Sequence, residues 1–217
     1  LKVDLTPAET PLRLHNMPTQ VSLFAQWLQG ATAKNLKADS ELKLSARESV
    51  FAGFEQFTFD DPVRSFAGSA QKVFDDKVDD SGHASFPVNV SLSAPPPGKL
   101  TATFVTRVFE ESGNFSTILR PYELLPFDHW VGINIPKGNG YMDAISRDAD
   151  HPVLIQTLNA QGKAEAARKV VMVASGSEVA LALDCAASLE AQGIGADQTA
   201  LRVVQLQLMA YASKSVG

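Results

Sequence analysis

The sequence predicts a mainly β chain, with an antiparallel β-sandwich over most of its length and a βαβ-like segment at its C-terminal end. Three observations indicate this fold class. Apolar and polar residues alternate from residue 1 to about residue 160, which is the period of strands with one buried face. Turn sequences rich in glycine and proline separate the alternating stretches. Before residue 163 no long stretch has the spacing of an amphipathic helix, so short strands joined by turns are expected.

Each expected strand places one face toward the core and the other toward water. The inward positions are, in chain order, Leu1, Val3 and Leu5; Val21, Leu23, Ala25 and Trp27; Leu42, Leu44 and Ala46; Phe86, Val88, Val90 and Leu92; Leu100, Ala102, Phe104, Thr106 and Val108; Val131, Ile133 and Ile135; and Val153 and Ile155. The turn sequences between them are Gln29-Gly30, Asp80-Ser81-Gly82, Pro95-Pro96-Pro97-Gly98, Ser112-Gly113-Asn114, Lys137-Gly138-Asn139-Gly140 and Gln161-Gly162.

The pattern changes near Lys163. Residues 169–174 form a continuous apolar run, which is typical of a strand covered on both faces. Ser175 and Glu178 then have the spacing of a helix capping box, and apolar residues follow at helical spacing up to Gly193. Residues 201–208 have the pattern of a strand again. Strand, helix and strand in this order predict a βαβ unit, with the helix at 176–192.

Composition excludes several classes of function. The 217 residues carry a net charge of -5, whereas nucleic-acid binding requires a basic surface. No apolar run is long enough to span a membrane. Cys185 is the only cysteine, so an internal disulfide is impossible. The chain starts at Leu1 without a leader or an initiating methionine, and we expect both of its ends to be cuts in a longer chain.

Polar side chains that could carry chemistry are scattered. The four histidines do not have the spacing of zinc ligands, and we expect no metal site. The sequence of residues 148–151 could ligate calcium through carboxylates, but it lacks the glycine and glutamate of a calcium loop. Ser175 to Ser177 could bind a phosphate, although a helix cap is the simpler interpretation. The aspartate pairs at 60–61, 75–76 and 79–80 are interpreted as solvated, and Cys185 as a buried structural thiol.

Aromatic residues are the most distinctive candidates for a functional site. Trp27, Trp130, Phe104 and Phe109 are most simply explained as core residues. Phe51, Phe54, Phe57 and Phe59 lie within nine residues of one another, beside Gly53. They could cap an end of the sandwich or contact a neighbouring domain, and the interdomain contact is slightly favoured.

Several segments in the same order resemble the macroglobulin-like domains of bacterial alpha-2-macroglobulins. They are Leu1-Lys2-Val3-Asp4-Leu5, the strand and turn at 25–37, the glycine-aromatic loop at 51–62, the segment Thr106-Arg107-Val108-Phe109-Glu110-Glu111-Ser112-Gly113-Asn114-Phe115-Ser116, the segment 126–132 and the segment 148–153. The resemblance implies fibronectin-like β-sandwiches. It predicts a macroglobulin-like domain at 1–126 and the start of a second at 127–168, with the βαβ-like segment at 169–217.

The resemblance also implies a function. It suggests a scaffold segment of an endopeptidase inhibitor that traps proteases after its bait is cleaved, and not an enzyme. The partners would be neighbouring macroglobulin-like domains and, through the full-length protein, target proteases. No cofactor and no nucleic acid are expected, and any membrane anchor would lie outside this stretch of a periplasmic protein. The sequence around Cys185 is not the Cys-Gln thioester motif of the family, so the reactive site is absent from this stretch.

Residues 169–204 are similar to another family, the C-terminal domain of transketolases. The similarity is carried by the apolar strand, the Ser175-Gly176-Ser177-Glu178-Val179 turn, the apolar helix and the Leu201-Arg202-Val203-Val204 strand. The alternative function is therefore a fragment of a thiamine diphosphate enzyme, from a domain that does not hold the cofactor. Under that hypothesis the chain is chimeric.

Overall fold

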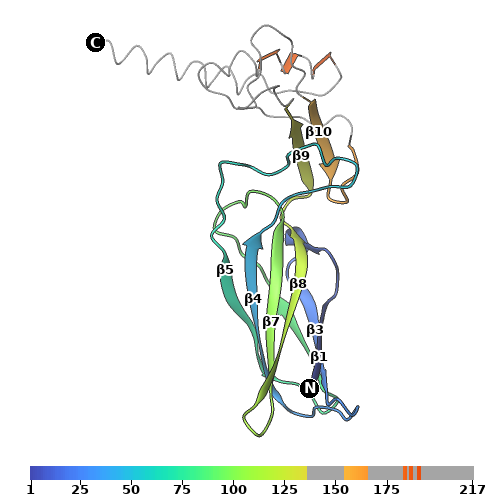
Figure 1. The fold of residues 1–217 in the computed structure, drawn as a ribbon, viewed down its shortest axis with the longest axis vertical. Helices are drawn as coiled ribbons and strands as arrows, with labels where there is room; N and C mark the ends of the chain where they lie inside the picture. Colours follow the sequence, from blue (N-terminus) through green and yellow to red (C-terminus); the bar gives the residue numbers. More distant parts are fainter. Residues whose placement is uncertain (136–153, 166–182, 185, 188–189, 192–217) are drawn as a thin grey trace, which may run out of the picture. The chain divides into compact units, whose positions relative to one another are not determined.

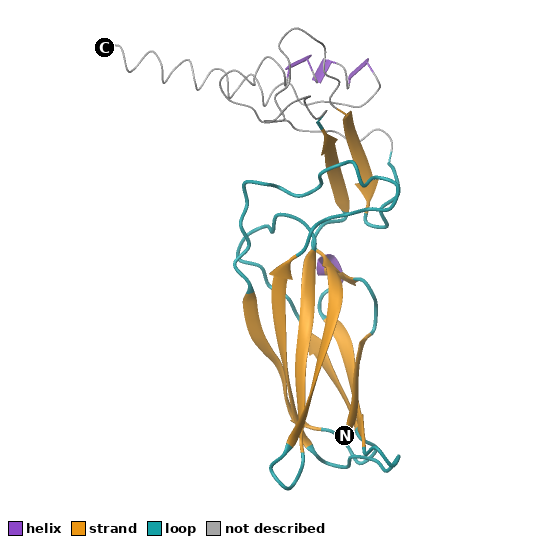
Figure 2. Cartoon of the chain, viewed as in Figure 1, coloured by secondary structure: helices purple, strands orange, loops and turns teal. Residues whose placement is uncertain are grey.

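The computed structural model describes residues 1–135, 154–165, 183–184, 186–187 and 190–191 (Figure 1). Almost all of their regular secondary structure is β-strand, which confirms the predicted fold class (Figure 2). The chain divides into two compact units, Leu1–Trp130 and Val131–Gly217. The division falls shortly after the domain boundary predicted at 126. The boundary predicted at 168 lies outside the described residues. In the described part of the chain, no helix is long and apolar enough to cross a membrane.

The first unit is a sandwich of two sheets. The strands β1, β3 and β6 form one sheet in the order β1-β3-β6, and the other sheet has the order β2-β8-β7-β4-β5. All neighbours pair antiparallel except β2 and β8. The elements are β1 (Lys2–Pro7), β2 (Leu12–Arg13), the 3-10 helix η1 (Leu14–Asn16), β3 (Thr19–Gln26), β4 (Lys37–Ala46), β5 (Ser69–Lys77), β6 (His83–Val88), β7 (Leu100–Phe109) and β8 (Phe115–Leu125).

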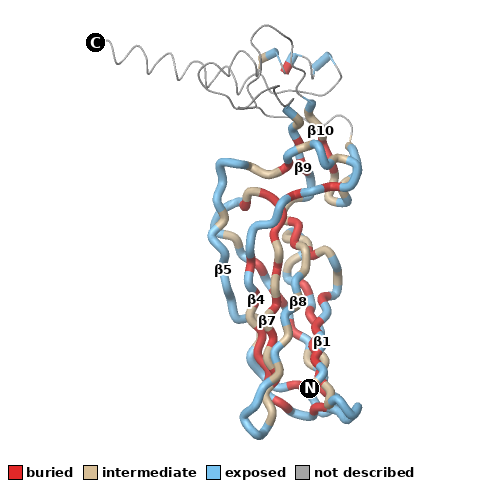
Figure 3. Tube along the Cα trace, viewed as in Figure 1, coloured by how far each residue is buried: buried red, intermediate tan, exposed pale blue. Residues whose placement is uncertain are grey.

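The core lies between the two sheets and follows the alternation in the sequence. Along β7 the residues from Leu100 to Val108 alternate between buried and half-exposed, so that every second side chain faces the core (Figure 3). Phe104 at the centre of β7 is fully buried, as are Leu5 of β1 and Leu23 of β3. Burial of each such side chain stabilises the fold by roughly 1.5–3 kcal/mol.

Polar groups inside the core are paired. Ser40 of β4 and Thr106 of β7 are cross-strand neighbours that both face the core. Their hydroxyl oxygens are 2.8 Å apart, so one donates a hydrogen bond to the other. The pairing offsets the cost of burying two hydroxyl groups, which would otherwise be unsatisfied.

A glycine is required at one of the predicted turns. Gly82 has a φ of +80°, a region that favours glycine. A Cβ at this position would lie 2.3 Å from the carbonyl oxygen of Ala25, a backbone atom of β3 that cannot easily move. The turn is further tied by Asp79, whose Oδ1 accepts hydrogen bonds from the backbone N–H groups of Ser81 and His83, both at 2.8 Å.

Two strands of the first unit were not expected from the alternation of apolar residues. No residue of β5 is buried, and β8 has buried residues only at its end, Leu124 and Leu125. Both lie toward the edges of the five-stranded sheet, where little of a strand contacts the core. Because strand prediction depends on alternating burial, such strands leave no periodic signal. Phe109 and Trp27 were also interpreted as core residues, but Phe109 at the end of β7 and Trp27 just after β3 are only half-buried.

The second unit contains most of β9 (His129–Asn134) and β10 (Leu154–Asn159), which form a two-stranded sheet. The predicted burial of Val131, Ile133 and Ile135 is wrong. These side chains are 52%, 39% and 52% exposed, while Trp130 and Gly132 on the opposite face of β9 are buried. Alternation along a strand distinguishes its two faces, but it does not show which face is inward. In β9 the packing of the Trp130 indole decides this.

The predicted βαβ segment falls mainly outside the described residues. The strands expected at 169–174 and 201–208 are not described. Six residues of the helix expected at 176–192, at 183–184, 186–187 and 190–191, are helical, and Ala186 is buried. The turn at 137–140, the segment 148–151 and Cys185 also lie outside the described part.

Candidate functional site

The loop that joins β4 to β5, here called the aromatic loop (residues 47–68), holds the four phenylalanines that the sequence singled out. Phe51 and Phe59 are 6% and 8% exposed, whereas Phe54 and Phe57 are half-buried. The rings of Phe51 and Phe59 meet edge to face with their centroids 4.8 Å apart. Phe57 lies 6.3 Å from Phe59 and 6.2 Å from Phe54, so the four rings form one continuous cluster.

Two aromatic residues from the end of the first unit complete this cluster. Trp130 is 2% exposed, and its indole packs edge to face on Phe51 at 5.3 Å and on Phe127 at 5.3 Å. The Nε1 of Trp130 is buried and has no hydrogen-bond partner among the described residues. The buried half of the aromatic loop is therefore an internal packing element, with pairwise ring contacts that each contribute about 0.5–1.5 kcal/mol beyond burial.

A buried lysine attaches the aromatic loop to the sandwich. Lys99 precedes β7, and its ammonium group lies 3.0 Å from the carbonyl oxygen of Val50 and 3.0 Å from Oε1 of Glu123 on β8. The same nitrogen lies 4.0 Å from the centroid of the Phe51 ring, which is a cation–π distance. One side chain thus ties the loop backbone, an aromatic ring and the large sheet together.

A second attachment uses the backbone beside Lys99. The hydroxyl of Ser49 accepts the N–H of Lys99 at 2.8 Å, and Oδ2 of Asp60 accepts the N–H of Ser49 at 3.0 Å. Gly98 is needed here, because a Cβ would lie 1.7 Å from Oδ1 of Asp60 and 2.4 Å from the Ser49 hydroxyl. Asp60 is thus a half-buried structural carboxylate, so the interpretation of this aspartate as solvated is wrong.

The outer half of the aromatic loop is shaped by successive tight turns. The N–H of Phe54 donates to the carbonyl of Phe51 at 3.0 Å, and the N–H of Phe57 donates to the carbonyl of Phe54 at 3.0 Å. The hydrogen bond from the N–H of Gly53 lowers the pKa of the Glu55 carboxyl that accepts it. Beside these turns, Val50 is 50% exposed and Val63 is 91% exposed. The loop therefore presents apolar side chains on a backbone that is held in place.

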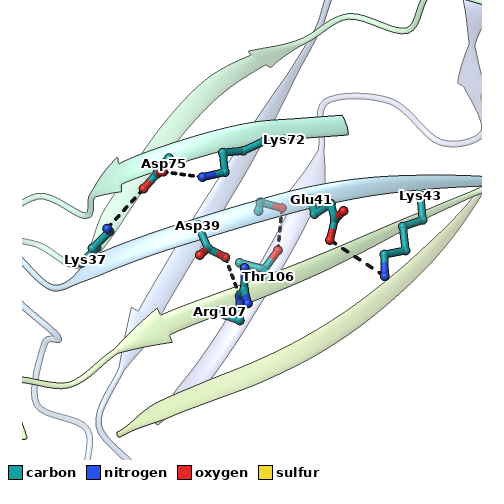
Figure 4. A network of polar contacts seen from close by, with 9 residues as sticks. Lys37, Asp39, Glu41, Lys43, Lys72, Asp75, Thr106 and Arg107 are labelled. Carbon is teal, nitrogen blue, oxygen red and sulfur yellow. Dashed lines mark hydrogen bonds and ion pairs between the residues drawn. The ribbon is translucent and has the colours of Figure 1, made fainter. Parts of the chain in front are cut away.

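The solvent face of the large sheet carries a charged network across β5, β4 and β7 (Figure 4). Asp39 and Asp75 are cross-strand neighbours, and such like charges repel each other. Each has a cation: Nε of Arg107 lies 2.8 Å from Asp39, and Nζ of Lys72 lies 2.7 Å from Asp75. The hydrogen bond from Lys72 and the charge of Lys37 lower the pKa of Asp75. The negative charges of Asp75 and Asp39 are therefore each compensated by a neighbouring cation, and both side chains have a structural role.

No catalytic centre emerges from the described residues. They contain no group of three or more histidine, cysteine, aspartate or glutamate side chains that could hold a metal ion. A depression at the other end of the sandwich is lined by Trp27, Lys34 and Glu110, among others. The aspartates at 79 and 80 have structural roles at the turn before Gly82. Oδ1 of Asp80 accepts a hydrogen bond from Nδ2 of Asn35 at 2.7 Å.

A two-sheet antiparallel sandwich with an anchored, partly exposed apolar loop is an architecture shared by many structural and binding domains. A family model for the MG5 domain of bacterial alpha-2-macroglobulin matches residues 1–117, which is more than half of the chain. The chain therefore belongs to the bacterial alpha-2-macroglobulin family. A search of curated protein sequences found no match.

Solved structures of this family have the same fold. The native conformation of Escherichia coli alpha-2-macroglobulin matches 76% of this chain with a TM-score of 0.54 and 19% identity. The trypsin-activated E. coli protein and the Salmonella protein reacted with methylamine give the same three values. The chain spans only 11–12% of the length of these structures. None of the findings supports the transketolase alternative, which is not retained.

Proposed function

We propose that this chain is a scaffold domain of a periplasmic protease-trapping protein, and that it holds neighbouring macroglobulin-like domains in place. The observation that carries the proposal is the match of residues 1–117 to the MG5 domain of bacterial alpha-2-macroglobulin. Two of the similar structures are of E. coli alpha-2-macroglobulin activated by proteases, trypsin in one case and porcine elastase in the other. A packed sandwich with anchored loops is suited to a domain that holds neighbouring domains in place and performs no chemistry.

The outer half of the aromatic loop is the proposed contact with a neighbouring domain. Phe54, Phe57 and Val63 supply exposed or half-exposed apolar surface, while Phe51 and Phe59 are buried and support them from beneath. The lysine anchor and the tight turns hold the loop before a partner binds, which reduces the entropy lost in forming the contact. Exposed aromatic side chains on a rigid backbone are typical of domain contacts.

Protease trapping is tested on the full-length protein that carries this chain. The protein is incubated with trypsin, and trypsin activity is then measured on a large protein substrate and on a small peptide substrate. We expect activity on the large substrate to be lost and activity on the small one to be retained. Equal activity on both substrates after cleavage of the protein would contradict the proposal.

The domain contact is tested by comparing one pair of substitutions in two contexts. Val50→Ser with Val63→Ser should change the unfolding free energy of the 217-residue chain by less than about 1 kcal/mol, because the two side chains are 50% and 91% exposed. In the full-length protein the same pair should lower the melting temperature by several degrees. Leu28→Ser is the control, since Leu28 is 82% exposed and lies outside the loop. Equal effects in the two contexts would show that the loop has no partner.

A further inference from the structure

The aromatic loop ends in a stretch, residues 61–68, that leads to β5 and is largely open to solvent. Residues 62–65 are all exposed, and Val63 is 91% exposed. The backbone N–H groups of Ser65 and Phe66 donate no hydrogen bond to any described residue. Folded proteins are cut by proteases at exposed stretches without strand pairing, because little of the fold has to open there.

Arg64 is the only basic residue of this stretch, and its contacts are weak. Nε of Arg64 lies 2.8 Å from Oδ2 of Asp61, and Nη1 donates to the carbonyl oxygen of Pro95 at 3.4 Å. The N–H of Arg64 donates to the carbonyl of Asp61 at 3.3 Å. The two side chains of the ion pair are 48% and 40% exposed, and an ion pair at such exposure stabilises a fold little. Arg64 can therefore be lifted out of the loop without disturbing a strand.

The other lysines and arginines of the first unit are held differently. They lie in strands or in segments that backbone hydrogen bonds tie to another part of the sandwich. Arg47, the second arginine of the aromatic loop, is also exposed, but its N–H donates to the carbonyl of Lys99 at 2.9 Å. The N–H of Lys99 in turn donates to the hydroxyl of Ser49 at 2.8 Å. Within the first unit, only the peptide bond after Arg64 combines a basic side chain with an exposed backbone that is not tied to the sandwich.

We propose that the peptide bond between Arg64 and Ser65 is a site of limited proteolysis by trypsin-like proteases. These proteases hold an arginine side chain against a carboxylate in their specificity pocket, which has to replace the carboxylate of Asp61. In the cut, the bond between the carbonyl carbon of Arg64 and the nitrogen of Ser65 breaks. Water supplies the hydroxyl group of the new carboxyl terminus and the proton of the new amino terminus.

Both sides of the cut remain attached to the sandwich. Before the cut, the carbonyl oxygen of Val50 accepts a hydrogen bond from the ammonium group of Lys99 at 3.0 Å. After the cut, β5 pairs with β4 over its whole length, and the ring of Phe74 stacks on that of Phe86 with centroids 4.5 Å apart. We therefore expect the cut chain to stay folded, with its two pieces held together.

The test is digestion of the 217-residue chain with trypsin in native buffer, with the fragments identified by their masses. Within residues 1–130, we expect the bond after Arg64 to be cut at least about tenfold faster than any other. Arg64→Gln should abolish this cut and Arg64→Lys should retain it, while Arg47→Gln is the matched control and should leave its rate unchanged. Asp61→Ala should accelerate the cut by up to about fivefold, because it removes the competing carboxylate. Urea unfolding of each variant checks that it is folded.

Size-exclusion chromatography of the cut chain gives a second readout. The two pieces should elute together in native buffer and separate only in denaturant. A first unit that is not cut, or that is cut first at another bond, would overturn the inference. So would an Arg64→Gln variant that is cut as fast as the wild type within residues 1–130, or a cut chain whose pieces separate in native buffer. The inference depends neither on protease trapping nor on the proposed domain contact, so each can fail alone.

Discussion

Replacement of Lys99 by methionine tests whether a buried ammonium group holds the aromatic loop on the sandwich. The Lys99 side chain is 9% exposed, and its nitrogen contacts Val50, Glu123 and the ring of Phe51 at 3.0, 3.0 and 4.0 Å. Methionine retains the length of the side chain and its contacts along the apolar stem. It removes the charge, the hydrogen bonds and the cation–π contact together.

The expected loss of unfolding free energy depends on how deeply the groups that lose their partner are buried. Removing one member of a buried ion pair costs about 3–5 kcal/mol, because the other charge is left uncompensated. The Glu123 side chain is 28% exposed, so water reaches it and reduces this cost. The lost cation–π contact adds about 1 kcal/mol. We expect Lys99→Met to lower the free energy of unfolding by about 3 kcal/mol.

Urea unfolding followed by tryptophan fluorescence measures this difference, since Trp130 lies in the same aromatic cluster. Lys43→Met is the control, because the Lys43 side chain is 54% exposed and its ion pair with Glu41 is 3.9 Å long. It should cost less than about 1 kcal/mol. Adding Glu123→Met to Lys99→Met should recover most of the lost stability. If Lys99→Met costs no more than Lys43→Met, the anchor is not a source of stability and the reasoning is refuted.

The turn between Asp79 and Gly82 allows two further predictions. Gly82→Ala should lower the free energy of unfolding in urea by about 3 kcal/mol, because the added Cβ would clash with the backbone and the φ of +80° is itself unfavourable for alanine. Gly30→Ala should lower it by only about 1 kcal/mol, because its φ of +92° is unfavourable but nothing lies within 4 Å of the added Cβ. Equal costs would show that the clash is relieved. Hydrogen bonds from Ser81 and His83 lower the pKa of Asp79 below 3.8, so its stabilisation is present above this pH and is lost as the pH falls further. The urea midpoint of Asp79→Asn should therefore vary less between pH 5 and pH 2 than that of the wild type; parallel curves would contradict this prediction.

The main core of the sandwich is separate from the apolar side chains of the aromatic loop at positions 51–59. The core between the sheets includes fully buried side chains such as Phe104 and Leu23 from both sheets, so folding does not depend on the loop surface.

The fold class was accessible from the sequence because it depends on local alternation. Strands with one fully buried face, such as β1, β3 and β7, repeat apolar residues at every second position, and the sequence predicts them. The edge strand β5 has no buried residue and β8 very few, so nothing in their composition distinguishes them from loops. Predicting these two would require knowledge of β4 and β7, the neighbours that supply their hydrogen bonds.

The aromatic loop was also recognised from the sequence, but its division into a buried and an exposed half was not. Phe51 and Phe54 have similar sequence surroundings, yet one is buried under Trp130 and the other is half-exposed. Lys99 would be taken as a surface residue from its type alone. It is buried because Glu123 and the carbonyl of Val50, which are distant in the sequence, meet at its ammonium group.

The sequence alone thus determines the two-residue period, the positions of the turns and the family to which the chain belongs, because these depend on near neighbours along the chain. The tertiary structure decides which face of β9 is inward, which phenylalanines are covered, and where Lys99 finds its partners. These outcomes depend on which side chains compete for the same space and on the charges that become neighbours when the sheets pack. Such contacts arise between residues far apart in the sequence, and no local pattern encodes them.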